Sequence, residues 1–161
     1  MFVPVEVRTS TIFGKGLFPT HGVKRGTIIC SFTTDARTIT DAEYLDAIRS
    51  NHYTVVRTGT RYVGKYFTCT DHTESEINFF NHAFDPNLLV HCGVVIALRD
   101  IEAGEEFTID YRTLVDDTDI GVYNDAASGQ VIKGFSARET LLRTTRQMLA
   151  LVESLEENWE G

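Results

Sequence analysis

Residues 81–87 read NHAFDPN, and residues 104–111 read GEEFTIDY. The first stretch predicts an ordered, turn-rich loop, because asparagine and proline favour turns and an asparagine amide both donates and accepts hydrogen bonds. The second stretch predicts a turn at Gly104 and then a strand that ends at Tyr111. Each stretch alone is typical of a structural loop or a surface hairpin, so the function they indicate depends on the segments that accompany them.

A third stretch, GKGLF at residues 14–18, lies between two expected strands. A Gly-x-Gly turn lets backbone atoms approach a ligand closely, although a tight turn is its commoner meaning. It does not match the dinucleotide-binding fingerprint, because the third glycine and the following helix are missing. His82 has no second histidine or carboxylate at the spacing of metal ligands, so we predict no metal site.

Taken in this order and at these separations, the three stretches resemble the motifs of the SET domain, the fold of a large class of protein-lysine methyltransferases. The family pattern is Gly-x-Gly, then Asn-His-x-x-x-Pro-Asn, then Gly-Glu-Glu-x-x-x-Asp-Tyr. The resemblance covers residues 5–111. It implies a mainly β (α+β) fold, a β-clip of short curved sheets around a pseudoknot, in which the chain from the second motif is threaded under the third.

The resemblance also implies a reaction. S-adenosyl-L-methionine would bind on one face, and the lysine of a basic protein or peptide, such as a histone, would enter a channel from the opposite face. Tyr111 would be the catalytic tyrosine at that channel, while Asn87 and Asp110 would stabilise the pseudoknot. The residues that would bind the cofactor, carried over from the family motifs and its tyrosine-led strand, are Gly14, Lys15, Gly16, Leu17, Tyr53, Asn81 and His82.

Methyl transfer to an amine makes demands that these residue types meet. The lysine must arrive neutral although its reference pKa is about 10.4, so desolvation and a nearby sulfonium charge must favour loss of the proton. In-line positioning of the reactants supplies roughly 7–11 kcal/mol in favourable cases. A tyrosine hydroxyl can orient the amine without ionising, and no metal or covalent intermediate is needed.

Some positions depart from the family pattern. Ala83 and Phe84 stand where relatives usually carry Ser-Cys, and Arg112 follows the tyrosine where small residues are common. Ile109 occupies a position at which relatives use Phe or Tyr to set the number of methyl groups. Because isoleucine has no hydroxyl to hold a water there, we expect no strict limit to one methyl group.

The segment after the tyrosine departs most. Many relatives carry a zinc-binding cysteine cluster there, whereas no cysteine follows Cys92, so this zinc is excluded. The sequence VIKGF at residues 131–135 resembles the tail that follows such a cluster. We therefore expect the flap, residues 112–135, to close the site without metal. Tyr123 or Phe135 would either pack on the adenine of the cofactor or belong to the core of the flap.

Three parts of the chain are predicted: a SET core at 1–111, the flap at 112–135 and a C-terminal helix at 136–161. In the helix, Ser136 and Glu139 form a capping box. The expected apolar stripe consists of Leu141, Thr145, Met148, Val152, Leu155 and Trp159, and Leu142 and Leu149 widen it on one side.

Charges along this helix oppose the helix dipole. Arginines lie early, at Arg138, Arg143 and Arg146, and glutamates lie late, which is the less favourable arrangement for an isolated helix. An antiparallel copy would place the arginines opposite the glutamates. We therefore hypothesise a homodimer through this helix, and packing of the helix on its own domain is at least as consistent with the pattern.

Other elements follow from short apolar runs between turn residues. A helix capped by Thr40 and Glu43 is expected to run to Ser50. The expected strands are 3–7, 27–32, 53–56, 61–63, 90–98 and 106–111.

Length and charge narrow the class of protein. The chain has 161 residues, enough for one domain with a short appendage. Its 23 acidic and 15 basic residues give a net charge of -8, which argues against direct nucleic-acid binding and favours a basic partner. Residues 102–125 hold eight of the acidic side chains, which form either a solvated surface run or an attractive rim beside a site for a cation.

The cellular location of the protein is predicted from sequence features that are absent. It has no long apolar run for a membrane helix, and residues 1–8 lack the pattern of a secretory signal. Cys30, Cys69 and Cys92 are expected to be buried, reduced thiols. These features predict a cytoplasmic protein without a membrane partner, and they leave a nuclear location open.

Three functions remain open from the sequence. The first is protein-lysine N-methyltransferase activity, which the retention of Asn81 and Tyr111 favours. The second is a catalytically weak SET-like module that binds a peptide or the cofactor, which the loss of Ser-Cys favours. The third is methylation of a small amine.

Overall fold

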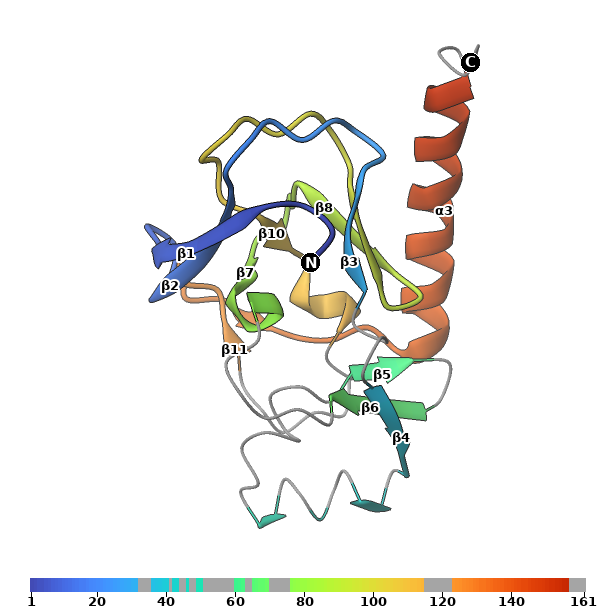
Figure 1. Cartoon of the computed structure of the whole chain (residues 1–161). Coiled ribbons are helices and arrows are strands. Elements are labelled where there is room, and N and C mark those ends of the chain that lie inside the picture. Colours follow the sequence, from blue (N-terminus) through green and yellow to red (C-terminus); the bar gives the residue numbers. More distant parts are fainter. Residues whose placement is uncertain are drawn as a thin grey trace.

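The computed structural model describes residues 1–31, 36–40, 42–43, 46, 49–50, 60–62, 65–69, 76–114 and 123–156 (Figure 1). These residues form small β-sheets and short 3-10 turns, with one long helix along one side, so the predicted mainly β fold with a C-terminal helix is confirmed. None of the described helices combines the length and the apolar character that crossing a bilayer requires.

The elements follow one another as β1 (Val5–Thr9), β2 (Lys15–Pro19), β3 (Ile28–Ser31), β4 (Ala36–Ile39), β5 (Thr60–Tyr62), β6 (Lys65–Cys69), η1 (Glu76–Phe79), β7 (Asn81–His82), β8 (Leu88–His91), β9 (Val94–Ala97), β10 (Thr108–Ile109), η2 (Tyr111–Thr113), β11 (Tyr123–Asn124), β12 (Val131–Ile132) and α3 (Ala137–Glu156).

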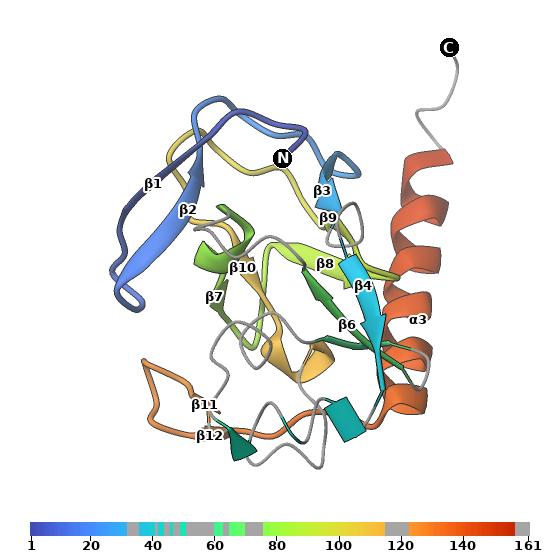
Figure 2. The same ribbon diagram turned by 60° about the horizontal axis from the view of Figure 1, so that its bottom comes forward.

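The sheets are small and mostly antiparallel. Strands β1 and β2 form a hairpin, β3-β9-β8 and β4-β6-β5 form three-stranded sheets, and β11 pairs with β12. The exception is the parallel pair of β7 and β10, in which Asn81 lies opposite Thr108 and His82 opposite Ile109. This pair brings the second and third sequence motifs side by side (Figure 2).

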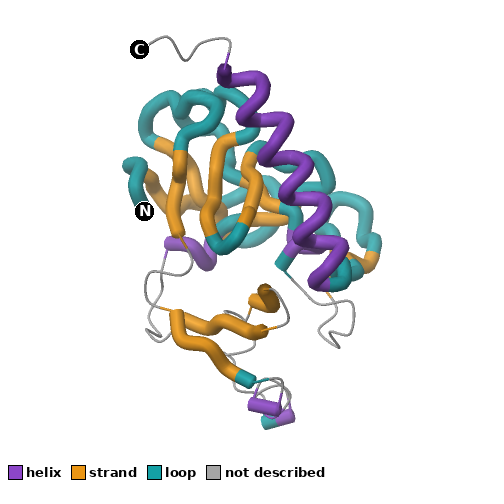
Figure 3. The backbone as a smooth tube through the Cα atoms, turned by 90° about the vertical axis from the view of Figure 1, so that its right-hand side faces the viewer, coloured by secondary structure: helices purple, strands orange, loops and turns teal. Residues whose placement is uncertain are grey.

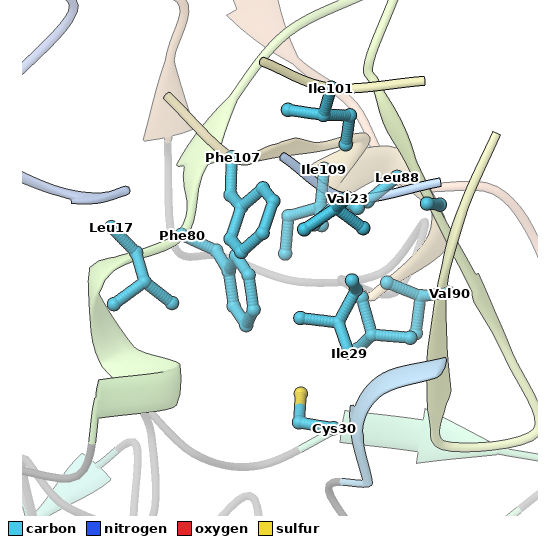
Figure 4. Close-up of a cluster of buried hydrophobic side chains, with 12 residues drawn as sticks. Leu17, Val23, Ile29, Cys30, Phe80, Leu88, Val90, Ile101, Phe107 and Ile109 are labelled. Carbon is cyan, nitrogen blue, oxygen red and sulfur yellow. The ribbon is translucent and has the colours of Figure 1, made fainter. Parts of the chain in front are cut away.

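The hydrophobic core lies directly behind these motifs (Figure 4). Phe80 precedes the second motif, and its ring lies 6.3 Å from that of Phe107 in the third. Phe107, Thr108 and Ile109 are all buried, so the segment around β10 lies inside the domain on both of its faces. Burial of each apolar side chain contributes roughly 1.5–3 kcal/mol, so the core fixes the backbone that carries the motif residues.

The prediction of one continuous buried strand at 90–98 is wrong. The segment is part of a hairpin of β8 and β9, which turns at Cys92 and Gly93, both with positive φ, at 54° and 76°. An apolar run on both sides of the turn obscures the hairpin in the sequence. Cys92 is therefore exposed and not buried as expected, whereas Cys30 is buried in the core, where desolvation raises its pKa to about 12.

The expected strand at 106–111 is shorter than predicted. Only Thr108 and Ile109 pair as strand β10. The carboxylate of Asp110 then accepts a hydrogen bond from the backbone N–H of Arg112 at 3.0 Å and caps the 3-10 turn η2, which begins at Tyr111. The tyrosine thus lies on a turn after the strand and not at the strand end.

The strands expected at 3–7 and 27–32 correspond to β1 and β3. Residues 53–56 lie outside the described residues, so a hairpin between 53–56 and 61–63 stays a prediction. The described residues Thr60–Tyr62 form β5, which pairs with β6. At the other predicted helix start, Thr40 and Glu43 form the expected reciprocal capping box, with N···O distances of 2.7 and 3.2 Å.

Helix α3 lies along the β core and packs on β8, with a face that only partly overlaps the predicted stripe (Figure 3). Leu141, Met148 and Leu155 of that stripe are half-buried. Thr140, Thr144 and Leu151 are buried, while Thr145 and Val152 of the predicted stripe are exposed. Thr144 faces inward because its hydroxyl bonds to the carbonyl of Thr140 at 2.9 Å and lies 3.0 Å from Nδ1 of His91 on β8. A buried threonine that satisfies its own hydroxyl is not recognised by an apolar pattern.

Only half of the capping box expected for α3 forms. The hydroxyl of Ser136 accepts a hydrogen bond from the N–H of Glu139 at 3.3 Å, but the Glu139 carboxylate pairs with Arg143 at 2.8 Å. Residues 157–161, including Trp159 of the expected stripe, lie outside the described residues.

Candidate active site

The two glycines of the first motif are required for different reasons. Gly14 has a φ of +52°, and no other atom lies within 4 Å of where a side chain would begin, so the backbone here is open to a ligand. Gly16 is the opposite case, because a methyl group at its Cα would collide with the carboxylate of Glu106. The turn between β1 and β2 therefore lies directly against the third motif.

Asn81 ties the first motif to the second. Its buried side-chain amide nitrogen lies 3.1 Å from the carbonyl oxygens of both Phe13 and Lys15, and 2.6 Å from Oε1 of Glu106. The amide thus anchors the backbone of the Gly-x-Gly turn. A hydrophobic side chain at this position would remove the donor that holds the carbonyls of Phe13 and Lys15 in place. It would also leave Oε1 of Glu106 with the Ser10 hydroxyl but without the amide.

Glu106 joins all three motifs, although the sequence analysis gave it no role. Each of its carboxylate oxygens lies 2.8 Å from the hydroxyl of Ser10, and Oε1 also accepts from Asn81. The Ser10 hydroxyl in turn accepts from the backbone N–H of Ile12 at 2.8 Å. In the sequence, only its position as the second glutamate of the third motif distinguishes this residue. The first glutamate, Glu105, forms an ion pair with Arg99 on the surface.

Asn87 closes the contact between the second and third motifs. It is 2% exposed, its amide donates to the carbonyl of Glu106 at 2.8 Å, and its side-chain oxygen accepts from the backbone N–H of Thr108 at 2.8 Å. Its own N–H donates to the Thr108 hydroxyl at 3.2 Å. These are the contacts expected of a residue that stabilises the crossing of the two segments. We call Asn81, Asn87, Glu106 and Thr108 the crossing.

Tyr111 lies beside the second motif, although it is 29 residues from His82 in sequence. Its backbone N–H donates to Nδ1 of His82 at 3.1 Å, and its ring centroid lies 5.3 Å from that of the histidine. Its hydroxyl donates to the carbonyl of Phe80 at 2.6 Å. Since Phe80 precedes Asn81, the phenol and the asparagine are brought to one place, as the sequence predicted.

His82 is held neutral. Its Nδ1 accepts a hydrogen bond, so the ring proton is carried by Nε2. Within the described part of the chain this Nε2 is buried without a hydrogen-bond partner. Burial lowers the pKa of the ring, and the negative charges of Asp110 and Asp125 oppose that shift only in part. A buried donor without a partner is uncommon in proteins and points to a missing acceptor.

The flap reaches the tyrosine through an aromatic contact. The ring of Tyr123 meets that of Tyr111 edge to face, with centroids 5.8 Å apart. Phe135 lies elsewhere, since its ring stacks under the guanidinium groups of Arg112 and Arg143 at 5.1 and 4.3 Å. Of the two aromatics proposed from the sequence, Tyr123 is thus the one beside the phenol.

Two departures from the family pattern contact each other. The guanidinium of Arg112 lies 4.8 Å from the ring of Phe84, and it pairs with Asp110 at 2.7 Å. The carbonyl of Arg112 also accepts a hydrogen bond from the N–H of Phe135 at 2.9 Å. We call Phe84, Asp110, Arg112 and Phe135 the clamp. The clamp attaches the flap to the second motif.

Among the described residues, no group of three or more His, Cys, Asp or Glu side chains could hold a metal ion.

The remaining residues predicted to bind the cofactor lie in different environments. Lys15 is exposed, and its ammonium lies 5.8 Å from the ring centroid of Phe79. Leu17 is fully buried in the core, and its carbonyl already accepts from the N–H of Phe107 at 2.8 Å. Tyr53 lies outside the described residues, so its assignment stays a prediction.

Most described carboxylates of the acidic segment 102–125 are engaged within the protein. Glu105 and Asp110 form ion pairs with arginines, Glu106 belongs to the crossing, and Asp125 accepts from the N–H of Ser128 at 2.8 Å. Glu102 is exposed. The described part of the segment therefore serves mainly to hold the site together, and residues 115–122 lie outside the description.

Comparisons with known proteins agree with this geometry. The family model for the SET domain matches residues 14–112, which is more than half of the chain. A crystal structure from Plasmodium falciparum, of a protein assigned provisionally as a histone methyltransferase, is similar in fold, with a TM-score of 0.50 and 20% sequence identity over 69% of this chain and 95% of that chain. No curated protein matches the chain at a significant level of similarity.

Proposed function

This chain belongs to the SET-domain family, and we propose that it transfers a methyl group from S-adenosyl-L-methionine to the side-chain amine of a lysine in a basic protein or peptide. The observation that carries this proposal is the position of the Tyr111 hydroxyl, which bonds to the residue preceding Asn81. A phenol and a cofactor-binding motif that are distant in sequence are thereby brought to one place.

The residues present fit the cofactor. Asn81 bonds to the two residues that flank the open backbone at Gly14, and it directly precedes His82, whose buried Nε2–H has no partner in the described part of the chain. Backbone groups of Gly14, Lys15 and Gly16 would hold the cofactor together with Asn81 and His82. When bound, the cofactor supplies a methyl group activated by a positively charged sulfur.

Tyr111 is suited to orient the substrate amine. Its hydroxyl donates to the carbonyl of Phe80, which fixes the orientation of the phenol, and a phenol oxygen is by its chemistry also an acceptor for an amine N–H. Holding the nitrogen in place directs its own lone pair, and such positioning is a large part of the rate in transfer reactions. Tyr111 need not ionise in this role.

The neutral state of His82 fits a positively charged cofactor. Because burial lowers its pKa, the ring offers its Nε2–H as a donor and adds no second positive charge beside the sulfonium. Tyr123 meets the phenol edge to face from the flap side. This aromatic contact adds to the desolvation that favours the neutral amine.

The substrate class is argued from charge, and the number of methyl groups from Ile109. A net charge of -8 favours encounter with a lysine-rich partner. Ile109 is 2% exposed and carries no hydroxyl, so no side-chain donor at this position holds a water in the place of a second methyl group. We therefore expect dimethyl- or trimethyl-lysine among the products.

The test uses the purified protein, S-adenosylmethionine with a labelled methyl group, and a lysine-rich protein mixture such as histones. Label should appear on lysine, and Tyr111→Phe should lower the rate at least about 100-fold, which corresponds to about 2.7 kcal/mol of barrier. Thr20→Val, which also removes a hydroxyl, at an exposed position directly after β2, is the control and should keep the rate within about two-fold of the unmodified chain.

Calorimetric titration with the cofactor separates the alternatives. Cofactor binding without transfer to any protein would favour the catalytically weak module, and transfer only to free amines would favour a small-molecule substrate. Absence of cofactor binding by the folded protein would contradict the proposal.

A further inference from the structure

Helix α3 carries a second apolar stripe that its own domain leaves uncovered. Leu142, Leu149 and Val152 are 40%, 57% and 39% exposed, and Thr145 between them is exposed as well. These four residues are the outer stripe. The buried face of the helix, with Thr144 at its centre, points instead toward β8. Figure 3 shows the helix lying along the outside of the β core, so that one flank of it has no neighbour among the described elements.

The spacing of the outer stripe is that of a helix–helix seam. Leu142, Thr145, Leu149 and Val152 follow one another at intervals of three, four and three residues, which is the pattern of coiled-coil contact positions. The next positions of the same pattern are Arg138 on the N-terminal side and Glu156 on the C-terminal side. A basic residue therefore occupies one end of the stripe and an acidic residue the other.

The stripe is complementary to itself when reversed. In an antiparallel pair of α3 helices centred at the level of Gln147, Leu142 lies opposite Val152 and Thr145 lies opposite Leu149. In the same register, position 138 of one copy lies opposite position 156 of the other, so that an arginine meets a glutamate at both ends. A parallel pair would place Arg138 against Arg138, which like charges disfavour.

The charges of the whole helix agree with this register. Arg138 and Arg146 belong to the first half, and Glu153 and Glu156 to the second, which is unfavourable for an isolated helix dipole. An antiparallel neighbour offsets this arrangement, since each end of one helix then lies beside the opposite end of the other. Arg143 is already engaged with Glu139 and with the ring of Phe135.

We propose that a second copy of this chain covers the outer stripe, forming a two-fold symmetric homodimer through antiparallel α3 helices. The same patch serves on both copies, as a two-fold interface requires. The proposal is independent of the methyltransferase function, because it rests on residues that do not contribute to the candidate active site.

The first test is the mass in solution by analytical ultracentrifugation or light scattering. The dimer has twice the 18.1 kDa of the chain. Leu149→Glu should raise the dissociation constant at least about 100-fold, because it places a charge at the centre of the apolar seam. Val131→Glu is the matched control, since Val131 is 56% exposed on β12 and lies outside α3. Circular dichroism checks that both variants remain folded.

The second test exchanges the end charges and does not depend on apolar residues. Arg138→Glu alone and Glu156→Arg alone should each weaken the dimer about 10-fold, and the double variant should return to within about three-fold of the unmodified chain. Single variants that leave the dissociation constant unchanged would indicate a parallel pair, in which like charges face each other before and after the exchange, and would overturn the proposal.

A cross-link fixes the register. In a Cys92→Ser background, mixing Leu142→Cys with Val152→Cys chains should give a disulfide-linked heterodimer under mild oxidation, more readily than either variant alone. A monomeric mass at tens of micromolar protein would overturn the proposal, whatever else then covers the stripe. So would a dimer that Leu149→Glu leaves intact.

Discussion

The crossing and the clamp both hold the candidate active site, but by different physical means. The crossing uses buried side-chain amides that bond to backbone groups, as Asn87 does with Glu106 and Thr108, and a carboxylate that binds the side chains of Asn81 and Ser10. The clamp uses a half-buried guanidinium that stacks on two aromatic rings and pairs with one carboxylate. The crossing is built mainly on positions that the family motifs specify, whereas the contact of Phe84 with Arg112 in the clamp depends on residues that depart from the family pattern.

The difference indicates which of the two regions opens more easily. A buried backbone group that loses its partner costs about 1–3 kcal/mol, and the crossing holds several such groups at once. A cation–π contact at a partly exposed site contributes about 0.5–1 kcal/mol. We therefore expect the clamp to open by local fluctuation while the crossing stays closed until the whole domain unfolds.

The largest expected effect is on stability, at Asn87. Asn87→Ala leaves the N–H of Thr108 and the carbonyl of Glu106 without their buried partners. We expect a loss of about 3–5 kcal/mol of unfolding free energy, measured by urea denaturation. Asn124→Ala, at an exposed position of β11, is the control. A loss below about 1 kcal/mol would show that the crossing is no stronger than the clamp.

Glu106→Gln tests whether the crossing also shapes the cofactor site. An amide at this position would place a donor beside either the Asn81 amide or the Ser10 hydroxyl, so at least one of these hydrogen bonds is lost. We expect the unfolding free energy to fall by about 1–3 kcal/mol and cofactor affinity to fall about 10-fold or more. Glu102→Gln, which is exposed, should change neither quantity. Unchanged affinity would separate the crossing from the cofactor site.

Arg112→Ala should open the clamp alone. The expected loss of global stability is about 1–2 kcal/mol, because an ion pair and two ring contacts are removed. Hydrogen exchange should accelerate at the N–H of Phe135 in the flap and remain slow at the N–H of Thr108 in the crossing. Arg112→Lys should restore little, since an ammonium lacks the planar surface that stacks on two rings. Equal acceleration at both amides would contradict the distinction between the two regions.

The smallest expected effect is the pH dependence at His91, outside both regions. Burial lowers the pKa of this histidine, so the fold favours the neutral ring. Its stabilising contribution is present above about pH 6.5, the pKa of the unfolded chain, and is lost as the pH falls through the lower folded value. His91→Gln should therefore reduce the fall in stability between pH 7 and pH 5. His21→Gln, at an exposed position, is the control.

The sequence predicted the crossing far better than the clamp. Motif residues such as Asn81 and Asn87 are recognised by their order and spacing, because the same crossing of two backbone segments requires the same side chains. The ion pair of Arg112 with Asp110 and its stacking on Phe84 involve residues that are two and twenty-eight positions away, and no periodicity predicts such a contact. Glu106 was missed because a second glutamate in a turn is usually solvated.

The errors in the fold have a common cause. The run at 90–98 is apolar on both arms of a hairpin, so its period does not reveal the turn at Cys92 and Gly93. On α3, apolar residues lie on two faces, and the buried one includes threonines that satisfy their own hydroxyls. Hydrophobicity alone therefore identified the helix but not the face that meets the domain.

The hydrogen bond between Ser10 and Glu106 has a consequence for biosynthesis. The two residues are 96 positions apart, so Ser10 lacks this partner until residue 106 has left the ribosome. Contacts this distant are made late and slowly in folding. A nascent chain that ends before residue 106 could not complete the candidate active site, and its first hairpin, without Glu106, would be a natural target for chaperones.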